Sequence, residues 1–371
     1  MSGPVVIAGG GTGGHVFVAD AVASALIEKG LHRGDLRFLG SRRGQERDLL
    51  GSTGIELVLL PGRGIKRSFA PRAIFDNAGA LAGVAWALVR SFALLVRWWP
   101  RAVVSVGGYA AGPAGLAAVI LRRPLILVNI DAVPGVTHRI LWRFARASCV
   151  SFASNPLPRS VVTGAPVRPA FTNLDRSTAG VSSARSALGC DPDRPLIAVT
   201  TGSLGARSVN RAVLGLAATW ADRPVTIYHV TGRRDFEEIM ATKPDRVPGG
   251  LDYRIVAFED QVPLLYQAAT VAITRAGALT VAELALAGVP AVLVPLPGAP
   301  GDHQTLNANA LGDVGAAVMV ADRDVTTERL AAEVESILLD DSKRQSMQEA
   351  AIAVGHPDAA VAVATVVLEH A

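Results

Sequence analysis

The fold of the first half of the chain is decided by residues 5–15, which read VVIAGGGTGGH. Residues 196–206, which read LIAVTTGSLGA, repeat the arrangement in the second half. In each stretch a short apolar strand passes into a glycine-rich turn and then into a helical pattern. This arrangement directs backbone N–H groups and a helix N-terminus at an anion. The two stretches therefore predict two nucleotide-binding-type domains with a cleft between them.

Apolar strand patterns alternate with longer helical patterns on both sides of these turns. Such alternation predicts an α/β fold with two Rossmann-like domains, each a parallel sheet covered by helices. The predicted strands are residues 4–8, 36–39, 56–60, 102–106, 125–129 and 148–152, followed by 196–200, 225–230, 253–257, 270–274 and 290–294.

The division into domains follows from length and proline content. At 371 residues the chain is too long for one ordinary hydrophobic core. Four prolines between residues 154 and 169, in a span without a helical pattern, place the hinge near residue 165. We expect an N-terminal domain at 1–165, a C-terminal domain at 166–342, and a helix at 343–371 that packs back on the first domain.

Composition and charge narrow the class of protein. The chain is 50% hydrophobic and 18% charged, which suits buried parallel strands and excludes a disordered chain. Two cysteines are too few for a disulfide scaffold, and no segment reads as a signal peptide, so we expect a reducing cytoplasm. The net charge of +4 favours anionic partners such as nucleotides, diphosphates or acidic lipids. No basic-aromatic tract predicts a nucleic-acid partner.

The first glycine turn is compatible with more than one kind of site. Gly9, Gly11 and Gly14 satisfy the G-x-G-x-x-G pattern of a dinucleotide site. Residues 41–43, which read SRR, stand where a site for NAD needs an acidic residue, so the turn would suit the 2′-phosphate of NADP at best. A P-loop is excluded because no Gly-Lys-Ser/Thr follows. A tight turn alone would explain two of the glycines but not five in six positions.

A second group of polar residues lies within residues 274–307. Gly277 opens a helix whose N–H groups can bind an anion, and Glu283 on that helix can accept hydrogen bonds from a vicinal diol such as a ribose. Residues 302–307, which read DHQTLN, follow a strand end, where open parallel sheets place groups that contact a ligand. A solvated helix residue or a helix cap would explain each side chain alone, but not the group.

These motifs resemble those of the UDP-N-acetylglucosamine transferases that convert lipid I to lipid II in peptidoglycan synthesis, which are GT-B glycosyltransferases of family 28. A member of this family serves cell wall biogenesis, and through it cell shape and cell division. The resemblance runs over nearly the whole chain. The positions that carry it are 10–17, 107–109 with 112–113, 164 with 166–168, 202–203 with 205–206, 275 with 277–280 and 283, and 303–304 with 307.

The resemblance implies a donor site in the second domain and an acceptor site in the first. The implied contacts with UDP-GlcNAc are Arg168 and Ser203 at the diphosphate, the backbone around Phe258 at the uracil, Glu283 at the ribose, Gln304 at the sugar, and Thr12, Gly13, Gly14, Asp131, Ala278, Leu279 and Thr280 around them. The implied contacts with the undecaprenyl-diphosphate-linked MurNAc-pentapeptide are Gly11, Gly13, Gly14, Gly107, Gly108 and Tyr109.

The implied reaction is inverting transfer of GlcNAc to a sugar hydroxyl. A base takes the hydroxyl proton, the oxygen attacks C1 from the face opposite UDP, and the leaving diphosphate is stabilised by cations and N–H groups. His15, where the first turn becomes a helix, is the candidate base, with a capping or packing histidine as the alternative. We expect neither a metal ion nor a cofactor, because Arg168 and helix N-termini can carry the charge.

The chain departs from the family pattern at Val18-Ala19, at Ala276 and, most of all, in one segment of the first domain. The family carries His-Glu-Gln-Asn after the fifth strand of the first domain, whereas residues 128–131 read VNID. Asp131 therefore replaces a donor-contacting amide, and an acidic helper is missing. This departure leaves open a UDP-GlcNAc-dependent transferase with another lipid-linked acceptor, or a nucleotide-sugar-binding protein without activity. The glycine turn alone leaves open an NADP-dependent oxidoreductase.

An apolar segment predicts contact with an anionic membrane surface. Residues 78–89 are apolar apart from glycine, but Arg90 and Arg97 end the run short of the ~20 residues that span a bilayer. A basic, aromatic-bearing helix lying on lipid fits this pattern, and a sheet-covering helix is the alternative. We expect a peripheral protein on the cytoplasmic face of the inner membrane. The other residues of this pattern are Lys66, Arg67, Arg72, Trp86, Phe92, Trp98 and Trp99.

Overall fold

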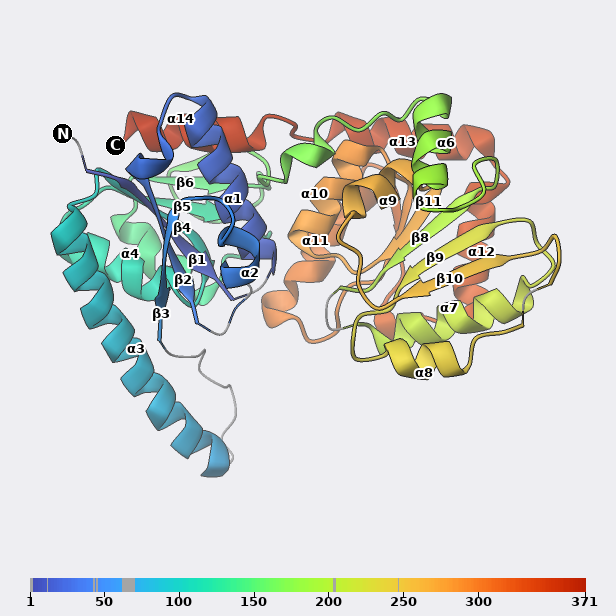
Figure 1. Ribbon diagram of the computed structural model, residues 1–371, viewed down its shortest axis with the longest axis horizontal. Coiled ribbons are helices and arrows are strands. Elements are labelled where there is room, and N and C mark those ends of the chain that lie inside the picture. The colour runs from blue at the N-terminus through green and yellow to red at the C-terminus, as the bar shows by residue number, and fades with distance from the viewer. Residues whose placement is uncertain are drawn as a thin grey trace. The chain divides into compact units, whose positions relative to one another are not determined.

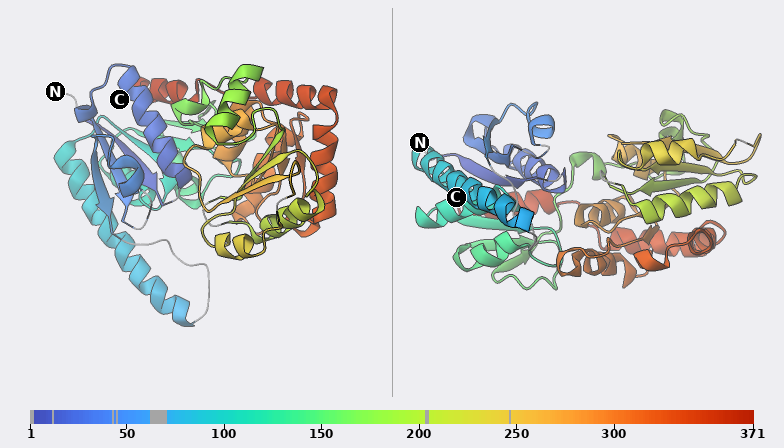
Figure 2. Two further views of the ribbon diagram at one scale, coloured as in Figure 1. Left: turned by 45° about the vertical axis from the view of Figure 1, so that its right-hand side comes forward. Right: turned by 90° about the horizontal axis from the view of Figure 1, so that it is seen from below.

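The computed structural model describes residues 3–11, 13–42, 44, 46–61, 71–202, 205–245 and 247–371, with the backbone alone for 71–81. The chain forms two compact units, Met1–Arg168 together with His356–Ala371, and Pro169–Gly355. Each unit contains one sheet with helices on both of its faces (Figure 1 and Figure 2).

The first unit has a parallel sheet in the order β3-β2-β1-β4-β5-β6-β7. The crossovers place α1 on one face and α4 on the other, and α14 packs beside α1 (Figure 1). The strands are β1 Val5–Gly10, β2 Leu36–Ser41, β3 Glu56–Leu60, β4 Ala102–Gly108, β5 Leu125–Asn129, β6 Ala147–Val150 and β7 Ser160–Val162. The helices are α1 Gly13–Glu28, α2 Glu46–Leu50, α3 Pro71–Trp98, α4 Ala111–Ile120, α5 Val136–Leu141 and α14 Ala359–Glu369.

The second unit has a parallel sheet in the order β10-β9-β8-β11-β12-β13. α7 packs with α12 on one face, and α10 packs with α9 and α11 on the other (Figure 1). The strands are β8 Leu196–Thr200, β9 Thr226–Val230, β10 Asp252–Val256, β11 Val271–Thr274, β12 Ala291–Leu293 and β13 Ala317–Met319. The helices are α6 Thr178–Ala187, α7 Arg207–Thr219, α8 Phe236–Ala241, α9 Val262–Ala268, α10 Ala278–Ala287, α11 His303–Gly312, α12 Thr327–Leu338 and α13 Asp341–Ala353.

In both sheets the first strand of the unit lies in the interior. β1 lies between β2 and β4, and β8 lies between β9 and β11. The next strands of the unit are added on one side of this strand, and the later strands are added on its other side. The loops that follow the two central strands therefore diverge at the carboxyl edge of the sheet. Open parallel sheets bind ligands at such a switch point. The two glycine-rich turns, which follow β1 and β8, therefore lie where a ligand is expected.

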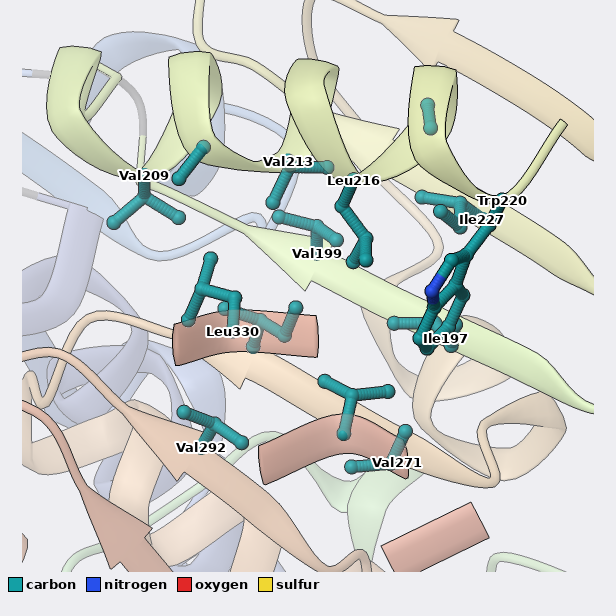
Figure 3. Close-up of a cluster of buried hydrophobic side chains, with 14 of the residues drawn as sticks. Ile197, Val199, Val209, Val213, Leu216, Trp220, Ile227, Val271, Val292 and Leu330 are labelled. Atoms are coloured by element: carbon teal, nitrogen blue, oxygen red, sulfur yellow. The ribbon is translucent and has the colours of Figure 1, made fainter. Parts of the chain in front are cut away.

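The core of the second unit explains the position of α7. Val209, Val213, Leu216 and Trp220 recur at helical spacing, and each is at most 2% exposed. Figure 3 shows these side chains pointing at those of β8 and β9. Burying one such side chain contributes about 1.5–3 kcal/mol. This apolar face holds the start of α7 at the carboxyl end of β8.

All of the predicted strands are present, and β3, β5 and β8 have the predicted bounds. The sequence analysis did not predict β7 and β13, which have three residues each and lie at a sheet edge. All three residues of β7 are exposed. β7 lacks the apolar pattern from which a strand is predicted, whereas β13 lies in the apolar run of residues 316–321, which read AAVMVA and were overlooked.

The prediction of one helix at 343–371 is wrong. α13 belongs to the second unit and packs on α10, whereas α14 belongs to the first unit and packs on α1. Gly355 and Pro357 lie between them, and both residues end helices. Only α14 therefore returns to the N-terminal unit. The chain passes between the units at residues 168–169 and 355–356, where we expected 165 and 342.

Candidate active site

The first glycine turn is a place where two stretches of backbone touch. β1 pairs with β4 so that Gly10 lies opposite Gly108. Gly10 has a φ of 129° and Gly108 a φ of 80°, and a Cβ atom on Gly108 would lie 1.8 Å from the Gly10 carbonyl oxygen. Only glycine permits both the positive φ and this approach. The loops after β1 and β4, both predicted to contact the acceptor, are therefore adjacent.

A buried carboxylate, which the sequence analysis missed, contacts this turn. Glu46, the first residue of α2, is 1% exposed. Its Oε1 accepts hydrogen bonds from the Gly11 N–H at 3.0 Å and from the Ser41 N–H at 2.7 Å. The Gly11 N–H, which we expected to face an anionic diphosphate, is thus already bound to a negative charge. The contact of Gly11 with the acceptor stays a prediction, but this N–H group is already engaged.

The other anion-binding groups of the turn belong to the start of α1. The helix begins at Gly13 and continues through Gly14 and His15. The first N–H groups of a helix have no partner within the helix. Gly13 and Gly14 are therefore the remaining candidates for a diphosphate contact here. Thr12, predicted as a donor contact, lies outside the described residues.

His15 lies against the backbone of β4 near the carboxyl end of that strand. A Cβ atom on Gly107 would lie 2.8 Å from His15 Nε2. Burial lowers the pKa of His15, and the negative charges of Asp131 and Glu46 partly offset that shift. A lowered pKa keeps the imidazole neutral at pH 7, the form in which it can take a proton.

A second histidine is buried close to Gly107. His138 of α5 is 3% exposed, and its Cε1 would lie 3.8 Å from a Cβ atom on Gly107. Its Nε2 lies 3.1 Å from Ser105 Oγ, and its Nδ1 lies 3.1 Å from Asn129 Oδ1. Burial and the neighbouring His15 lower the pKa of His138 to about 4. The sequence analysis missed this residue, because nothing in residues 136–141 distinguishes it from a surface histidine.

Asp131 is fixed through its main chain. Its carbonyl oxygen accepts hydrogen bonds from Asn129 Nδ2 at 2.6 Å and from Asn155 Nδ2 at 3.1 Å. Asn129 and Asn155 are both buried. Asp131, predicted as a donor contact, therefore lies at a defined place at the carboxyl edge of the first sheet.

Tyr109 and Arg168, two more predicted site residues of the first unit, each contact a neighbouring group. The Tyr109 hydroxyl donates to the Pro61 carbonyl at 3.0 Å, and burial raises the pKa of this phenol. The Arg168 guanidinium lies over the ring of Phe17, 4.6 Å from its centroid. A cation–π contact of this kind orients the guanidinium.

The glycine turn of the second unit packs against the loop after β9. Gly202 and Gly205 have φ values of 79° and 77°, and the Gly205 N–H donates to the Gly202 carbonyl at 3.0 Å. A Cβ atom on Gly232 would lie 2.3 Å from the Gly205 nitrogen. α7 begins just after this turn, and no described side chain caps its N-terminus. Ser203, the predicted diphosphate contact, lies outside the described residues.

α10 supplies a second uncapped helix start in this unit. Its N-cap is Gly277, and no side chain within the described part of the chain caps it. Ala278, Leu279 and Thr280 form its first turn, as the predicted site requires. Glu283, further along the helix, is 8% exposed. The helix start can bind an anion through its N–H groups, and the carboxylate can accept hydrogen bonds from hydroxyls.

Gln304 joins two loops of this site. Its Oε1 accepts hydrogen bonds from the Ala276 N–H at 3.2 Å and the Leu296 N–H at 2.9 Å. The buried Asn307 adds a bond from Nδ2 to the Ala276 carbonyl at 3.2 Å. Because two backbone donors fix which amide atom is oxygen, the Gln304 NH₂ group is the part that can donate to a ligand.

Arg275 fixes the ends of two neighbouring strands. Its Nη1 lies 2.6 Å from Asp322 Oδ1, an atom to which Ser208 Oγ also donates at 2.6 Å. Nη1 also donates to the Val294 and Pro295 carbonyls, each at 3.2 Å. Arg275 therefore holds the loop that leads to α10.

Phe258, the marker of the predicted uracil contact, lies in the loop after β10 and is 44% exposed. The guanidinium of Arg233, in the loop after β9, lies 5.3 Å from the centroid of its ring. The sequence analysis missed Arg233, for which two consecutive arginines after a predicted strand were the available signal. Both side chains lie at the carboxyl edge of the second sheet.

The described residues bear on two kinds of partner, a metal ion and a lipid bilayer. No group of three or more His, Cys, Asp or Glu side chains among these residues could hold a metal ion. Within the same part of the chain, no helix has the length and apolar character needed to cross a membrane.

Known proteins match the whole chain. Residues 5–150 match the glycosyltransferase family 28 N-terminal domain, and residues 196–363 match the family 28 C-terminal domain. Two relatives bear the name UDP-N-acetylglucosamine–N-acetylmuramyl-(pentapeptide) pyrophosphoryl-undecaprenol N-acetylglucosamine transferase. The one from Alkalilimnicola ehrlichii is 38% identical with 100% of both chains covered, and the one from Desulforudis audaxviator is 35% identical with 96% of this chain and 95% of the relative covered.

A solved structure matches as well. The crystal structure of Acinetobacter baumannii MurG is 30% identical, covers 100% of both chains and has a TM-score of 0.74. The two parallel sheets and this match over the full length confirm the predicted GT-B fold.

Proposed function

We propose, because this chain belongs to glycosyltransferase family 28, that it transfers GlcNAc from UDP-GlcNAc to lipid I and so forms lipid II in peptidoglycan synthesis. The observation that carries the proposal is the similarity, over nearly the full length, to transferases named for this reaction. The same matches confirm the family that the motifs predicted.

The second unit has groups suited to the donor. The uncapped start of α10 would bind a phosphate, and Glu283 would accept hydrogen bonds from the ribose hydroxyls. The NH₂ group of Gln304 would donate to the GlcNAc hydroxyls, since its oxygen is bound to two backbone N–H groups. The backbone around Phe258 would contact the uracil.

The first unit has groups suited to the acceptor and to the chemistry. The acceptor hydroxyl gives its proton to His15 while its oxygen forms a bond to C1 of GlcNAc. The bond between C1 and the UDP oxygen breaks, and UDP leaves as the diphosphate anion. N–H groups at helix starts and the Arg168 guanidinium would stabilise that anion.

Glu46 argues against the NADP-dependent alternative. A 2′-phosphate would have to lie near the end of β2, where the Ser41 N–H donates to the Glu46 carboxylate. A buried negative charge at this place repels a phosphate. The oxidoreductase alternative therefore has no support beyond the glycine pattern.

A patch on the first unit suits a membrane surface. α4 packs against α3 and against α5, so their outer faces adjoin. Exposed apolar side chains there adjoin exposed arginines, a combination that favours anionic lipid. Its apolar members are Trp86, Val89, Val96, Leu116, Ile120, Val136, Ile140 and Phe144, and its basic members are Arg97, Arg122, Arg139 and Arg143.

The test of the reaction is release of UDP from UDP-GlcNAc in the presence of a lipid I analogue. We expect turnover that needs both substrates and that persists in the presence of a metal chelator. Binding of UDP-GlcNAc without turnover would favour the silent binding protein, and turnover with a different polyprenyl-linked acceptor would favour another transferase. Loss of activity on chelation, reversed by magnesium, would contradict the metal-free mechanism.

The test of the membrane surface is co-sedimentation with vesicles. We expect binding to vesicles that contain an anionic phospholipid, and weaker binding by an Ile120→Asp/Ile140→Asp variant. Leu339→Asp is the matched control, because Leu339 is 77% exposed but lies in the second unit. Equal binding by both variants would contradict the proposed surface.

A further inference from the structure

Asp131 occupies a position where the family pattern has an amide, and the family's acidic residue two positions earlier is Asn129 here. Asn129 ends β5 and is 4% exposed. β5 lies beside β4, which lies beside β1. The loop that carries Asp131 therefore lies on the same sheet edge as Gly107 and the start of α1.

The hydrogen bonds of Asn129 fix which of its amide atoms donates and which accepts. Its Nδ2 donates to the Asp131 carbonyl, so the atom that faces His138 Nδ1 is its oxygen. An amide oxygen only accepts, so His138 carries a hydrogen on Nδ1, while its Nε2 lies 3.1 Å from the Ser105 hydroxyl and 3.2 Å from the Ser105 carbonyl. Donors thus run from His138 through Asn129 to the main chain of Asp131. The pKa of His138, about 4, keeps this ring neutral at pH 7.

A second amide reaches the same carbonyl from a different loop. Asn155 is 6% exposed, and its Nδ2 donates to the carbonyls of Asp131 at 3.1 Å and Ala132 at 3.3 Å. Two converging donors fix the main chain at Asp131. They therefore limit the region that its carboxylate can reach.

The charged and titratable groups that act on His15 come from three elements. They are Asp131 in the loop after β5, Glu46 on α2 and His138 on α5. Of the two carboxylates, Asp131 raises the pKa of His15 more. Glu46 already accepts two backbone hydrogen bonds, and His138 is neutral at pH 7.

We propose that Asp131 is a positioning residue of the transfer reaction, whose carboxylate stabilises the protonated form of His15. Asn129 and Asn155 hold Asp131 in place for this role. The inference rests on the proposed function, in which His15 is the base. It gives Asp131 a role different from the donor contact that its position in the family pattern implies.

The role follows from the proton that the reaction moves. When the acceptor hydroxyl loses its proton to His15, a positive charge appears on a partly buried ring, where low polarity disfavours it. A nearby carboxylate lowers the free energy of that imidazolium and makes the neutral ring a stronger base. The proton leaves His15 to solvent after UDP departs.

The test compares Asp131→Asn with Asp131→Glu. The pKa of His15 is measured by NMR from its ring Cε1–Hε1 signal, assigned with His15→Ala, and the dependence of kcat on pH is measured with a lipid I analogue. Asp48→Asn is the matched control, because Asp48 is an exposed carboxylate in the same unit.

We expect Asp131→Asn to lower the pKa of His15 and to shift the acidic limb of the kcat profile to lower pH. Turnover should fall roughly 10- to 100-fold, as for loss of a group that orients a functional histidine, with the KM for UDP-GlcNAc nearly unchanged. Asp131→Glu should recover part of the turnover. Asp48→Asn should change neither quantity.

Other outcomes overturn the inference in distinguishable ways. An unchanged pKa of His15 in Asp131→Asn would exclude the electrostatic pair. A raised KM for UDP-GlcNAc with an unchanged pH profile would make Asp131 a donor contact. Full activity of His15→Ala would instead refute the proposed base and remove any catalytic role for the pair, whether or not the NMR titration detects it.

Discussion

The two glycine turns have the same sequence pattern and the same place in their sheets, but different surroundings. In the first unit the Gly11 N–H donates to the buried Glu46 carboxylate. In the second unit a buried carboxylate, that of Asp235, also lies against the turn at Gly205, but it is paired with the Arg234 guanidinium. The turn leads into α7, and α10 starts beside it, with no N-cap side chain bonded to either helix start. A strand, a glycine turn and a helix therefore do not by themselves make a phosphate site. The residue that approaches the turn from elsewhere decides its use.

This difference separates the roles of the two units. A fixed carboxylate near the first turn repels a diphosphate and raises the basicity of His15. Helix starts without caps in the second unit attract a diphosphate. We infer that the first turn mainly supports the base and that the second unit mainly binds the nucleotide.

The largest expected effect is that of His15→Ala. Turnover should fall by roughly two to four orders of magnitude, the range for a lost general base, with UDP affinity and melting temperature close to the parent's. Steady-state kinetics, calorimetry with UDP and thermal unfolding measure the three quantities. A lower melting temperature with normal turnover per folded molecule would assign His15 to packing and would weaken the contrast between the units.

Glu46→Ala should affect the stability of the first unit. The substitution leaves the N–H groups of the buried Ser41 and of the exposed Gly11 without their acceptor, and a buried unpaired group costs ~1–3 kcal/mol. We expect a loss of about 1–3 kcal/mol in urea unfolding. UDP affinity, a property of the second unit, should stay unchanged in the folded variant. Asp48→Ala, at an exposed site on the same helix, is the matched control and should leave the stability unchanged.

Acid should destabilise the two units in the same way, because each has a buried neutral histidine. Burial lowers the pKa of His138 to about 4 and that of His229 to about 3, against 6.5 for the ordinary group. Between these values and 6.5 the unfolded chain binds more protons, so stability present above pH 6.5 is lost as the pH falls. For His138 the loss reaches roughly 3 kcal/mol near pH 4, of which about 2 kcal/mol is present at pH 5. Urea midpoints at pH 7.5 and 5 measure this part of the loss.

The variants that test this acid sensitivity replace either a buried or an exposed histidine. His138→Asn and His229→Asn should each reduce the dependence of stability on pH, whereas His32→Asn, at an exposed site, should not. A pH dependence that is the same in all three variants would show that other groups cause the acid sensitivity.

Glu283→Ala should weaken UDP and UDP-GlcNAc alike, because a ribose contact is common to both. Loss of hydrogen bonds to a charged acceptor costs on the order of 1.5–3 kcal/mol. Isothermal titration calorimetry measures both affinities. Unchanged affinity for both nucleotides would remove Glu283 from the donor site.

The smallest expected effect is that of Gln304→Glu, which keeps an oxygen for the Ala276 and Leu296 N–H groups but removes the NH₂ donors. We expect a loss of about 1 kcal/mol in UDP-GlcNAc affinity, and a smaller loss for UDP. Gln304→Ala should in addition lower the melting temperature, because it removes the hydrogen bonds that join the two loops. Equal losses for the two nucleotides would contradict a contact with the sugar.

Much of the fold could be predicted from local sequence. β5 and β8 are strands buried on both faces, and their continuous apolar runs predicted their bounds. The bounds of β3, an edge strand, followed from the apolar run Leu57–Leu60, and the glycine turns marked the switch points because a turn with positive φ requires glycine. The short edge strand β7 and the break between α13 and α14 were missed, since the first has no buried face and the second depends on what each helix packs against.

The candidate site also contains residues that local sequence predicts and residues that it does not. Sequence determined that His15, Glu283 and Gln304 follow strand ends or lie near helix starts, because these are local positions. Only the tertiary structure brought Glu46 to Gly11, 35 residues away, and His138 to Ser105, 33 residues away. Parallel strands bring the loops after their carboxyl ends to one edge, whatever their separation in the chain. That convergence decides which polar groups meet at the edge and which N–H groups stay available to a ligand. No short stretch of sequence contains this information.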